Sequence, residues 1–283
     1  MRPTPLVLSV LTALSLSFAP PVRAQTSADA ALEQGIVAVR QGDFEGAIAA
    51  FQQATELDPN SAAAHYNLGL AYHQNQQPQE AATAFWQATQ ADPAFTLAYV
   101  NLGAALLDGN NPDQAADYLR RAIEIDPELG IAYYNLGLVQ RRQGNIPAAM
   151  DSFLRAAELS HQAPDVHYQI GLIYLQQDQL AGAQQAFETA VAIDPNYPEA
   201  FYNLGITRLR QGQAEAALPA FDRAIQLFPN FGHAYYSQAL ALDELGRQEE
   251  AQQHLEQALG IYLAQGRGEW AAQAQAQLDR LSE

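Results

Sequence analysis

The amino-acid sequence of 283 residues predicts an all-α solenoid, in which antiparallel helix pairs stack one after another. Three observations predict it: a 34-residue period, two helical stripes of apolar residues in each period, and turn residues between the stripes. The period is clearest in residues 62–95, which read AAAHYNLGLAYHQNQQPQEAATAFWQATQADPAF. Because repeats of this kind pack only on their neighbours, we expect one elongated domain rather than two globular ones.

Small residues recur in register along the chain. Positions 20 and 27 of the unit hold alanine in every repeat, and position 8 holds glycine in six repeats and alanine in the seventh. The position-8 residues are Gly35, Gly69, Gly103, Gly137, Gly171, Gly205 and Ala239. A glycine inside a helix costs about 0.5–1 kcal/mol relative to alanine. Their repetition therefore predicts close approach between helices, with large residues such as Phe85 at position 24 filling the space alongside.

The period divides the chain into seven units. They cover residues 28–61, 62–95, 96–129, 130–163, 164–197, 198–231 and 232–265, after a short lead at residues 25–27. Apolar positions 4, 7, 8 and 11 predict a first helix in each unit, and positions 20, 24 and 27 predict a second. In residues 266–283, apolar residues such as Trp270, Ala274 and Leu278 recur at helical spacing between polar ones. They predict a C-terminal capping helix.

Helix ends are marked by turn and stop residues. Glycine, asparagine and proline lie between the two stripes of a unit, as in Gln41-Gly42-Asp43 and Asn110-Asn111-Pro112. Four second helices close with an Asp-Pro pair, because proline cannot continue a helix. His161 replaces the proline in the fourth unit and Leu263 replaces it in the seventh. We therefore expect a different joint at Ser160 to Pro164.

The unit length and the order of small and large residues resemble the tetratricopeptide repeat (TPR) family over residues 28–265. The resemblance implies a right-handed superhelical solenoid whose first helices line a concave groove. It also implies binding of a protein or a peptide as the usual activity. For the asparagines at position 6, it implies a row of side-chain amides that holds an extended peptide.

Helical periodicity places positions 2, 5, 6, 9, 12 and 13 of the first helices on the inner face. Amides suit a peptide backbone, because each offers a donor and an acceptor. The predicted peptide-binding groove comprises Tyr66, Asn67, Asn101, Tyr134, Asn135, Tyr168, Gln169, Tyr202 and Asn203. The same amides and tyrosines could instead pack between neighbouring hairpins. A further alternative is a carbohydrate or cell-wall binding module, in which the tyrosines stack on sugar rings.

The residues at position 2 argue against one family mode, the clamping of a C-terminal carboxylate by lysine and arginine. Acidic or uncharged side chains stand there instead, among them Leu97, Ile131, Asp165 and Glu199. The sequence therefore predicts a partner that is not recognised by its terminal carboxylate.

Composition narrows the function further. A formal net charge of −17 disfavours nucleic acid as a partner, since phosphates require clustered basic residues. There is no cysteine, and no paired histidine spacing, nucleophile elbow or phosphate loop is found. We therefore expect a non-enzymatic scaffold or adaptor with no cofactor and no metal, which binds a protein or peptide partner. Self-association into a homo-oligomer stays open.

Residues 1–24 have the form of a secretory signal peptide. Arg2 precedes a mostly apolar run from Leu6 to Ala19, and Val22-Arg23-Ala24 places small residues before a cleavage site. The run is shorter than the about 20 apolar residues that span a bilayer. We expect cleavage after Ala24 and an exported protein, periplasmic or secreted, that does not span the membrane. An organellar lumen is a further setting.

Overall fold

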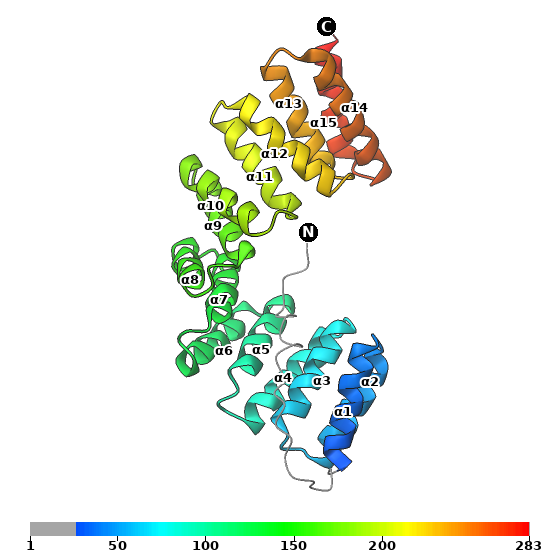
Figure 1. The fold of residues 1–283 in the computed structure, drawn as a ribbon, viewed down its shortest axis with the longest axis vertical. Helices are drawn as coiled ribbons and strands as arrows, with labels where there is room; N and C mark the ends of the chain where they lie inside the picture. The colour runs from blue at the N-terminus through cyan, green and yellow to red at the C-terminus, as the bar shows by residue number, and fades with distance from the viewer. Residues whose placement is uncertain (1–26, 283) are drawn as a thin grey trace. The chain divides into compact units, whose positions relative to one another are not determined.

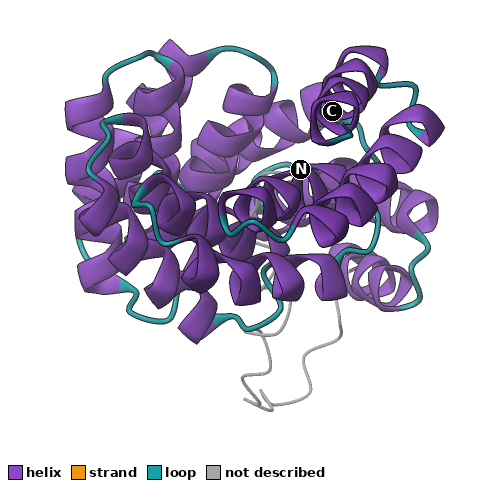
Figure 2. Ribbon diagram, turned by 90° about the horizontal axis from the view of Figure 1, so that it is seen from above, coloured by secondary structure: helices purple, strands orange, loops and turns teal. Residues whose placement is uncertain are grey.

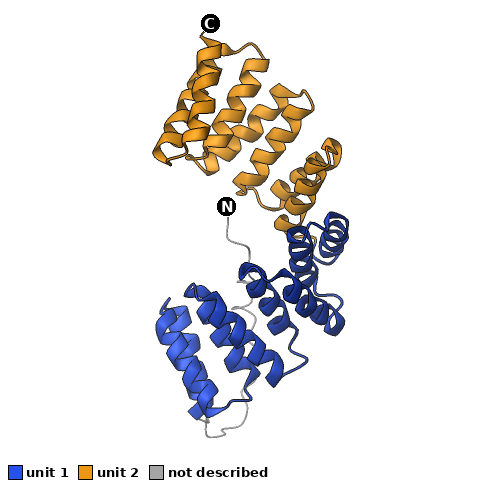
Figure 3. Ribbon diagram, turned by 180° about the vertical axis from the view of Figure 1, so that it is seen from behind, with its two compact units in different colours: residues 1–160 blue, residues 161–283 orange. Residues whose placement is uncertain are grey.

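The computed structural model describes residues 27–282, which form fifteen α-helices joined by short turns, with no strand among these residues (Figures 1 and 2). The predicted all-α solenoid of antiparallel helix pairs is thereby confirmed. Contacts divide the chain into two compact units, residues 1–160 and 161–283 (Figure 3). The boundary between them falls at Ser160, inside the joint where the Asp-Pro pair is missing. The predicted signal peptide lies outside the described residues.

Unit 1 holds four helix pairs. Their bounds are α1 (Ser27–Arg40), α2 (Phe44–Leu57), α3 (Ala62–Gln74), α4 (Pro78–Ala91), α5 (Thr96–Asp108), α6 (Pro112–Ile125), α7 (Gly130–Arg142) and α8 (Ile146–Leu159). Helices α2, α4 and α6 also contact the first helix of the next pair, which is α3, α5 and α7 respectively. The first helices α1, α3, α5 and α7 therefore form one layer, and the second helices form the other.

Unit 2 holds three pairs and a terminal helix. Their bounds are α9 (Pro164–Gln176), α10 (Leu180–Ile193), α11 (Pro198–Arg210), α12 (Ala214–Leu227), α13 (Gly232–Glu244), α14 (Gln248–Ala264) and α15 (Gly268–Leu281). Helix α14 has 17 residues, whereas α12 has 14. It continues past the place where Leu263 replaces the usual proline. Helix α15 packs on α14 through Ala271 and Ala274. It lies within residues 266–283, where the sequence predicts a terminal helix.

The turn inside each pair has one residue in the left-handed backbone region. This residue is Gly42, Gln76, Asn110, Gly144, Asp178, Gly212 or Gly246, and its φ lies between 58° and 78°. Glycine adopts this conformation without a steric cost, whereas a side chain is strained there. The recurrence at every 34th residue explains the glycine and asparagine seen between the two stripes of the sequence.

The aspartate of each Asp-Pro pair has a bonding role of its own. Its backbone N–H closes the helix, as from Asp92 to the Ala88 carbonyl, and its side chain then accepts from the backbone N–H two residues further on. The distance is 2.9 Å from the Ala94 nitrogen to Asp92 Oδ1 and 3.0 Å from the Glu128 nitrogen to Asp126 Oδ1. The aspartate thus shapes the loop to the next first helix, while proline ends the previous helix.

The repeated glycines lie directly against the large residues at position 24. A methyl group added to Gly69 would lie 2.6 Å from the Phe85 ring, and one added to Gly205 would lie 2.5 Å from the Phe221 ring. Both rings are fully buried. The predicted close approach of helices is confirmed. The glycine at position 8 faces the residue at position 24 of the same repeat, which is phenylalanine except in the third repeat, where Gly103 faces Leu119.

Candidate functional site

The first helices of each unit carry a stripe of side chains at positions 2, 6, 9 and 13, which lie one above another on one helix face. In unit 1 the stripes on the consecutive first helices α3, α5 and α7 are Ala63-Asn67-Leu70-Gln74, Leu97-Asn101-Ala104-Asp108 and Ile131-Asn135-Leu138-Arg142. In unit 2 the stripes on α9, α11 and α13 are Asp165-Gln169-Leu172-Gln176, Glu199-Asn203-Ile206-Arg210 and His233-Ser237-Leu240-Glu244. These stripes contain the predicted amide row.

Tyr66 and Asn101 form a buried pair between neighbouring first helices. The Asn101 amide donates to the Tyr66 hydroxyl over 2.9 Å, from α5 to α3. The Tyr66 ring lies against Phe85 and Phe95, with centroid distances of 5.7 and 4.8 Å. Burial raises the pKa of Tyr66 to about 12, and the hydrogen bond from Asn101 acts in the opposite direction. The pair therefore links two repeats through both packing and a hydrogen bond.

The other predicted residues of unit 1 are buried as well. Asn67 donates to the Ala63 carbonyl of its own helix over 2.8 Å. Tyr134 packs on Phe153 with ring centroids 5.9 Å apart, and the amide nitrogen of Asn135 is buried without a hydrogen-bond partner. The residue at position 5 one repeat before Asn135 is Val100, which has no hydroxyl to accept its hydrogen bond. This absence explains the unpartnered nitrogen.

Unit 2 repeats the tyrosine–amide pair in a more open setting. The Asn203 amide donates to the Tyr168 hydroxyl over 3.2 Å and to the Glu199 carbonyl over 2.8 Å, and all three residues are half-buried. The Tyr168 ring lies 5.9 Å from Phe187 and 5.0 Å from Tyr197. The structure thus brings these residues together across α9 and α11, as it does with Tyr66 and Asn101 across α3 and α5.

Tyr202 occupies the same place one repeat later. Its ring lies 6.2 Å from Phe221 and 4.9 Å from Phe231, so it packs between two rings as Tyr66 does. Burial raises the pKa of Tyr202, and a hydrogen bond with the Ser237 side chain acts in the opposite direction. Ser237 therefore takes the place of asparagine as the partner supplied by the next repeat.

Two acceptors on the stripes of unit 2 have no donor. Gln169 Oε1 on α9 and Glu199 Oε2 on α11 are buried atoms without a hydrogen-bond partner. Asp165, one turn before Gln169, accepts from the Tyr197 hydroxyl over 2.8 Å. Buried acceptors are normally satisfied, and leaving one unpaired costs about 1–3 kcal/mol. These two atoms are therefore places where a ligand that donates hydrogen bonds would gain most.

Sequence reasoning missed the aromatic residue that closes the packing around the tyrosines. Phe95, Tyr197 and Phe231 all stand at position 34 of their repeats, and each contacts the position-5 tyrosine of the same repeat. The signal was present, because position 34 is aromatic only where position 5 is tyrosine. A pairwise reading of the two positions would have found it.

The structure also bears on metal binding and membrane insertion. Among the described residues, no group of three or more His, Asp or Glu side chains is gathered so that it could hold a metal ion. None of the helices within residues 27–282 combines the length and the apolar character that crossing a bilayer requires.

Several solved structures are similar in fold. PilF of Pseudomonas aeruginosa is 20% identical with a TM-score of 0.66, over 76% of this chain and 97% of that one. PilW, a type IV pilus biogenesis factor, is 20% identical with a TM-score of 0.66, over 75% and 98%. YrrB, a TPR protein with an unusual peptide-binding site, is 24% identical with a TM-score of 0.53, over 66% and 97%. No curated protein matches the sequence.

Family models match most of the chain. A model described as TPR repeat matches residues 37–76 and 171–212. Two models described as tetratricopeptide repeat match residues 75–130 and 100–166, and residues 197–264. Members of this family are generally non-enzymatic scaffolds that bind protein partners. With the helix pairs and the repeated contacts between glycine and phenylalanine, these matches show that the chain belongs to the tetratricopeptide repeat family.

Proposed function

We propose that this protein is an exported, non-enzymatic scaffold, and that the first-helix stripes of unit 2 hold an extended, basic segment of a partner protein. The observation that carries the proposal is the pair of buried acceptors without donors, Gln169 Oε1 and Glu199 Oε2. A peptide backbone N–H can donate to Gln169, and a lysine or arginine side chain can donate to Glu199.

The surroundings of these acceptors favour a basic segment. Position 2 of the stripes is acidic on both α9 and α11, at Asp165 and Glu199, and the whole chain carries a net charge of −17. Half-buried aliphatic side chains, Leu172 and Ile206, follow one turn after the amides and give apolar contact area. An extended peptide can therefore meet acceptors at one end of the stripe and aliphatic surface at the middle. The resemblance to YrrB, which has a peptide-binding site, agrees with this use of the fold.

The amides of unit 1 support the proposal less directly. Asn67 and Asn101 are both buried and both donate to groups of the chain itself. Asn203 also donates within the chain, but its side chain is half-buried. We therefore assign peptide contact first to Gln169 and Asn203, and we assign the role of inter-repeat link to Asn101. The use of the tyrosines as a stacking surface for sugars is less favoured, since Tyr66 and Tyr134 are 5% and 4% exposed.

A peptide selection would test this function. A library of random displayed peptides is selected on the full chain, and synthetic copies of the captured peptides are measured by calorimetry at two salt concentrations. We expect lysine and arginine to be enriched, and we expect Glu199→Gln to weaken binding about tenfold with reduced salt dependence. Glu215→Gln is the matched control, because that glutamate lies exposed on the second helix α12 of the same unit. Captured peptides without basic residues, bound equally by Glu199→Gln, would contradict the proposal.

Export forms a separate part of the proposal and rests on the sequence of residues 1–24. Mass spectrometry of the protein isolated from its source is expected to find Gln25 as the first residue. A mature chain that still begins at Met1 would contradict export through a cleaved signal.

A further inference from the structure

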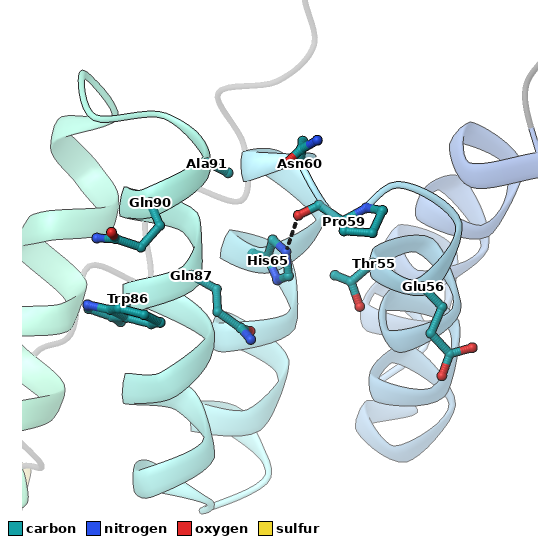
Figure 4. Close-up of a pocket in the computed structure, with 9 residues that line it drawn as sticks. All are labelled: Thr55, Glu56, Pro59, Asn60, His65, Trp86, Gln87, Gln90 and Ala91. Atoms are coloured by element: carbon teal, nitrogen blue, oxygen red, sulfur yellow. Dashed lines mark hydrogen bonds between the residues drawn. The ribbon is translucent and has the colours of Figure 1, made fainter.

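A cavity on the second-helix layer of unit 1 lies apart from the stripes described above. It has a volume of about 430 Å³ and lies between α2 and α4, above the first turn of α3 (Figure 4). Its lining residues are Thr55, Glu56, Pro59, Asn60, His65, Trp86, Gln87, Gln90 and Ala91. The cavity therefore combines one large aromatic side chain with mainly uncharged polar groups.

Trp86 is the unusual residue of this cavity. Its side chain is 45% exposed, although indole rings bury large apolar areas in most packed structures. It stands at position 25 of its repeat, and no other repeat has an aromatic residue there: the other residues are Gln52, Arg120, Leu154, Glu188, Asp222 and Glu256. Repeat packing thus does not require a tryptophan at this position. An exposed indole face beside a cavity is suited to stacking on a ligand ring.

The floor of the cavity contains a histidine with an unused acceptor. His65 is 8% exposed, and its Nε2 lies 3.0 Å from the Pro59 carbonyl oxygen, as the dashed line in Figure 4 shows. A carbonyl oxygen only accepts, so Nε2 carries the proton and Nδ1 is left as an acceptor. Nδ1 is buried and has no hydrogen-bond partner. A ligand hydroxyl that reaches the floor would supply the missing donor.

The remaining polar groups specify the chemistry of the ligand. The amides of Asn60, Gln87 and Gln90 each offer both donors and an acceptor, and Glu56 adds one carboxylate. Sugar hydroxyls both donate and accept, so they can satisfy every one of these groups. An arginine side chain could also stack on Trp86 and donate to Glu56, but it has no acceptor for the three amides.

We infer that this cavity is a saccharide-binding site, in which a pyranose ring stacks on Trp86 and its hydroxyls bond to the amides and to His65. The inference does not depend on the peptide-binding function proposed for unit 2, since the cavity lies wholly within unit 1. It also differs from a sugar site on the tyrosines of the first helices, because Trp86 belongs to a second helix.

Tryptophan fluorescence gives a direct test. The chain has two tryptophans, so Trp270→Phe leaves Trp86 as the single reporter. This variant of the full chain is titrated with cellotetraose, maltotetraose and the tetramer of N-acetylglucosamine. We expect at least one of them to shift the Trp86 emission and to protect it from acrylamide quenching. We also expect Trp86→Ala to lower the affinity measured by calorimetry on the natural background by at least about tenfold.

Leu154→Ala provides the matched control. Leu154 occupies the same repeat position on α8 of the same unit and is 43% exposed, but it does not line the cavity. It should leave saccharide affinity unchanged. Gln90→Ala, a substitution on the exposed side of α4, should weaken binding without altering the circular dichroism spectrum. The inference is overturned if none of the three saccharides changes the Trp86 signal at millimolar concentration, or if only an arginine-containing peptide does so.

Discussion

The first-helix stripes of the two units share one register but differ in chemistry. At position 2, α5 and α7 of unit 1 carry Leu97 and Ile131, whereas α9 and α11 of unit 2 carry Asp165 and Glu199. The amide of Asn101 is buried in its bond to Tyr66, whereas that of Asn203 is half-buried and divides its bonds between Tyr168 and a backbone carbonyl. The hydrogen-bonded pair of tyrosine and asparagine between neighbouring first helices is therefore closed in unit 1, whereas in unit 2 it is more open and has acidic side chains at position 2 beside it.

This difference distinguishes polar side chains that stabilise the fold from polar side chains that are available to a ligand. In unit 1 the Asn101 amide is used by the fold itself, because the buried hydroxyl of Tyr66 needs a hydrogen bond from the next first helix. Asn101 Oδ1 of unit 1 also lacks a donor, but it belongs to a side chain that is 1% exposed, whereas the unpaired acceptors of unit 2 belong to the half-buried side chains of Gln169 and Glu199. An amide in a repeat is therefore assigned to ligand binding only after its own hydrogen-bond partners have been identified.

The largest effect that this comparison predicts is a loss of stability in alkali. The neutral phenol of Tyr66 is the form that the folded chain holds, with a pKa of about 12 against about 10 when unfolded. The contribution of the neutral Tyr66 phenol to folding stability is therefore complete below pH 10 and is lost as the pH rises through 12. The expected loss is about 2–3 kcal/mol in the free energy of unfolding. Urea unfolding between pH 9 and 12 measures it.

The control for this effect is Tyr66→Phe, which removes the titrating group and keeps the ring against Phe85. The unfolding free energy of the natural chain minus that of this variant should fall steadily as the pH rises above 10, because only the natural chain carries the titrating hydroxyl. A difference that is constant across this pH range would show that the Tyr66 hydroxyl is not held neutral by its surroundings.

The sequence predicted the framework because the framework repeats. The helices, the turns and the contact between Gly69 and Phe85 each depend on residues within one 34-residue unit. The repeat period therefore reveals them. The link between Tyr66 and Asn101 depends on two residues in different repeats, 35 positions apart, and single-position patterns do not reveal such a pair. Whether Gln169 and Asn203 contact a peptide stays a prediction, since a ligand decides it. Trp86 was overlooked for the opposite reason, because it departs from the repeat.

Removal of the amide is expected to have a smaller effect, which differs between the units. Asn101→Ala leaves the buried Tyr66 hydroxyl without its donor, which costs about 1–3 kcal/mol. Asn203→Ala should cost less than about 1 kcal/mol, because Tyr168 is half-buried and alanine is a better helix former by some tenths of a kcal/mol. Chemical denaturation of both variants measures the difference.

In the Tyr66→Phe background, the cost of Asn101→Ala should fall, as a double-mutant cycle would reveal. Equal costs in the two units would remove the distinction between a closed and an open pair of tyrosine and asparagine.

The smallest effect concerns the left-handed turn residue, which is Gln76 in unit 1 and Asp178 in unit 2, with φ of 59° and 58°. Gln76→Gly should stabilise the chain by about 1 kcal/mol, because glycine adopts this conformation without strain. Asp178→Gly relieves the same strain but removes the exposed ion pair with Arg210, which has an Nη2 to Oδ1 distance of 2.8 Å. Such pairs contribute about 0–1 kcal/mol, so the net change should lie closer to zero. Thermal unfolding at low and high salt separates the two contributions, because salt weakens only the ion pair. If Gln76→Gly destabilised the chain, the glutamine side chain would have a stabilising role that outweighs its backbone strain.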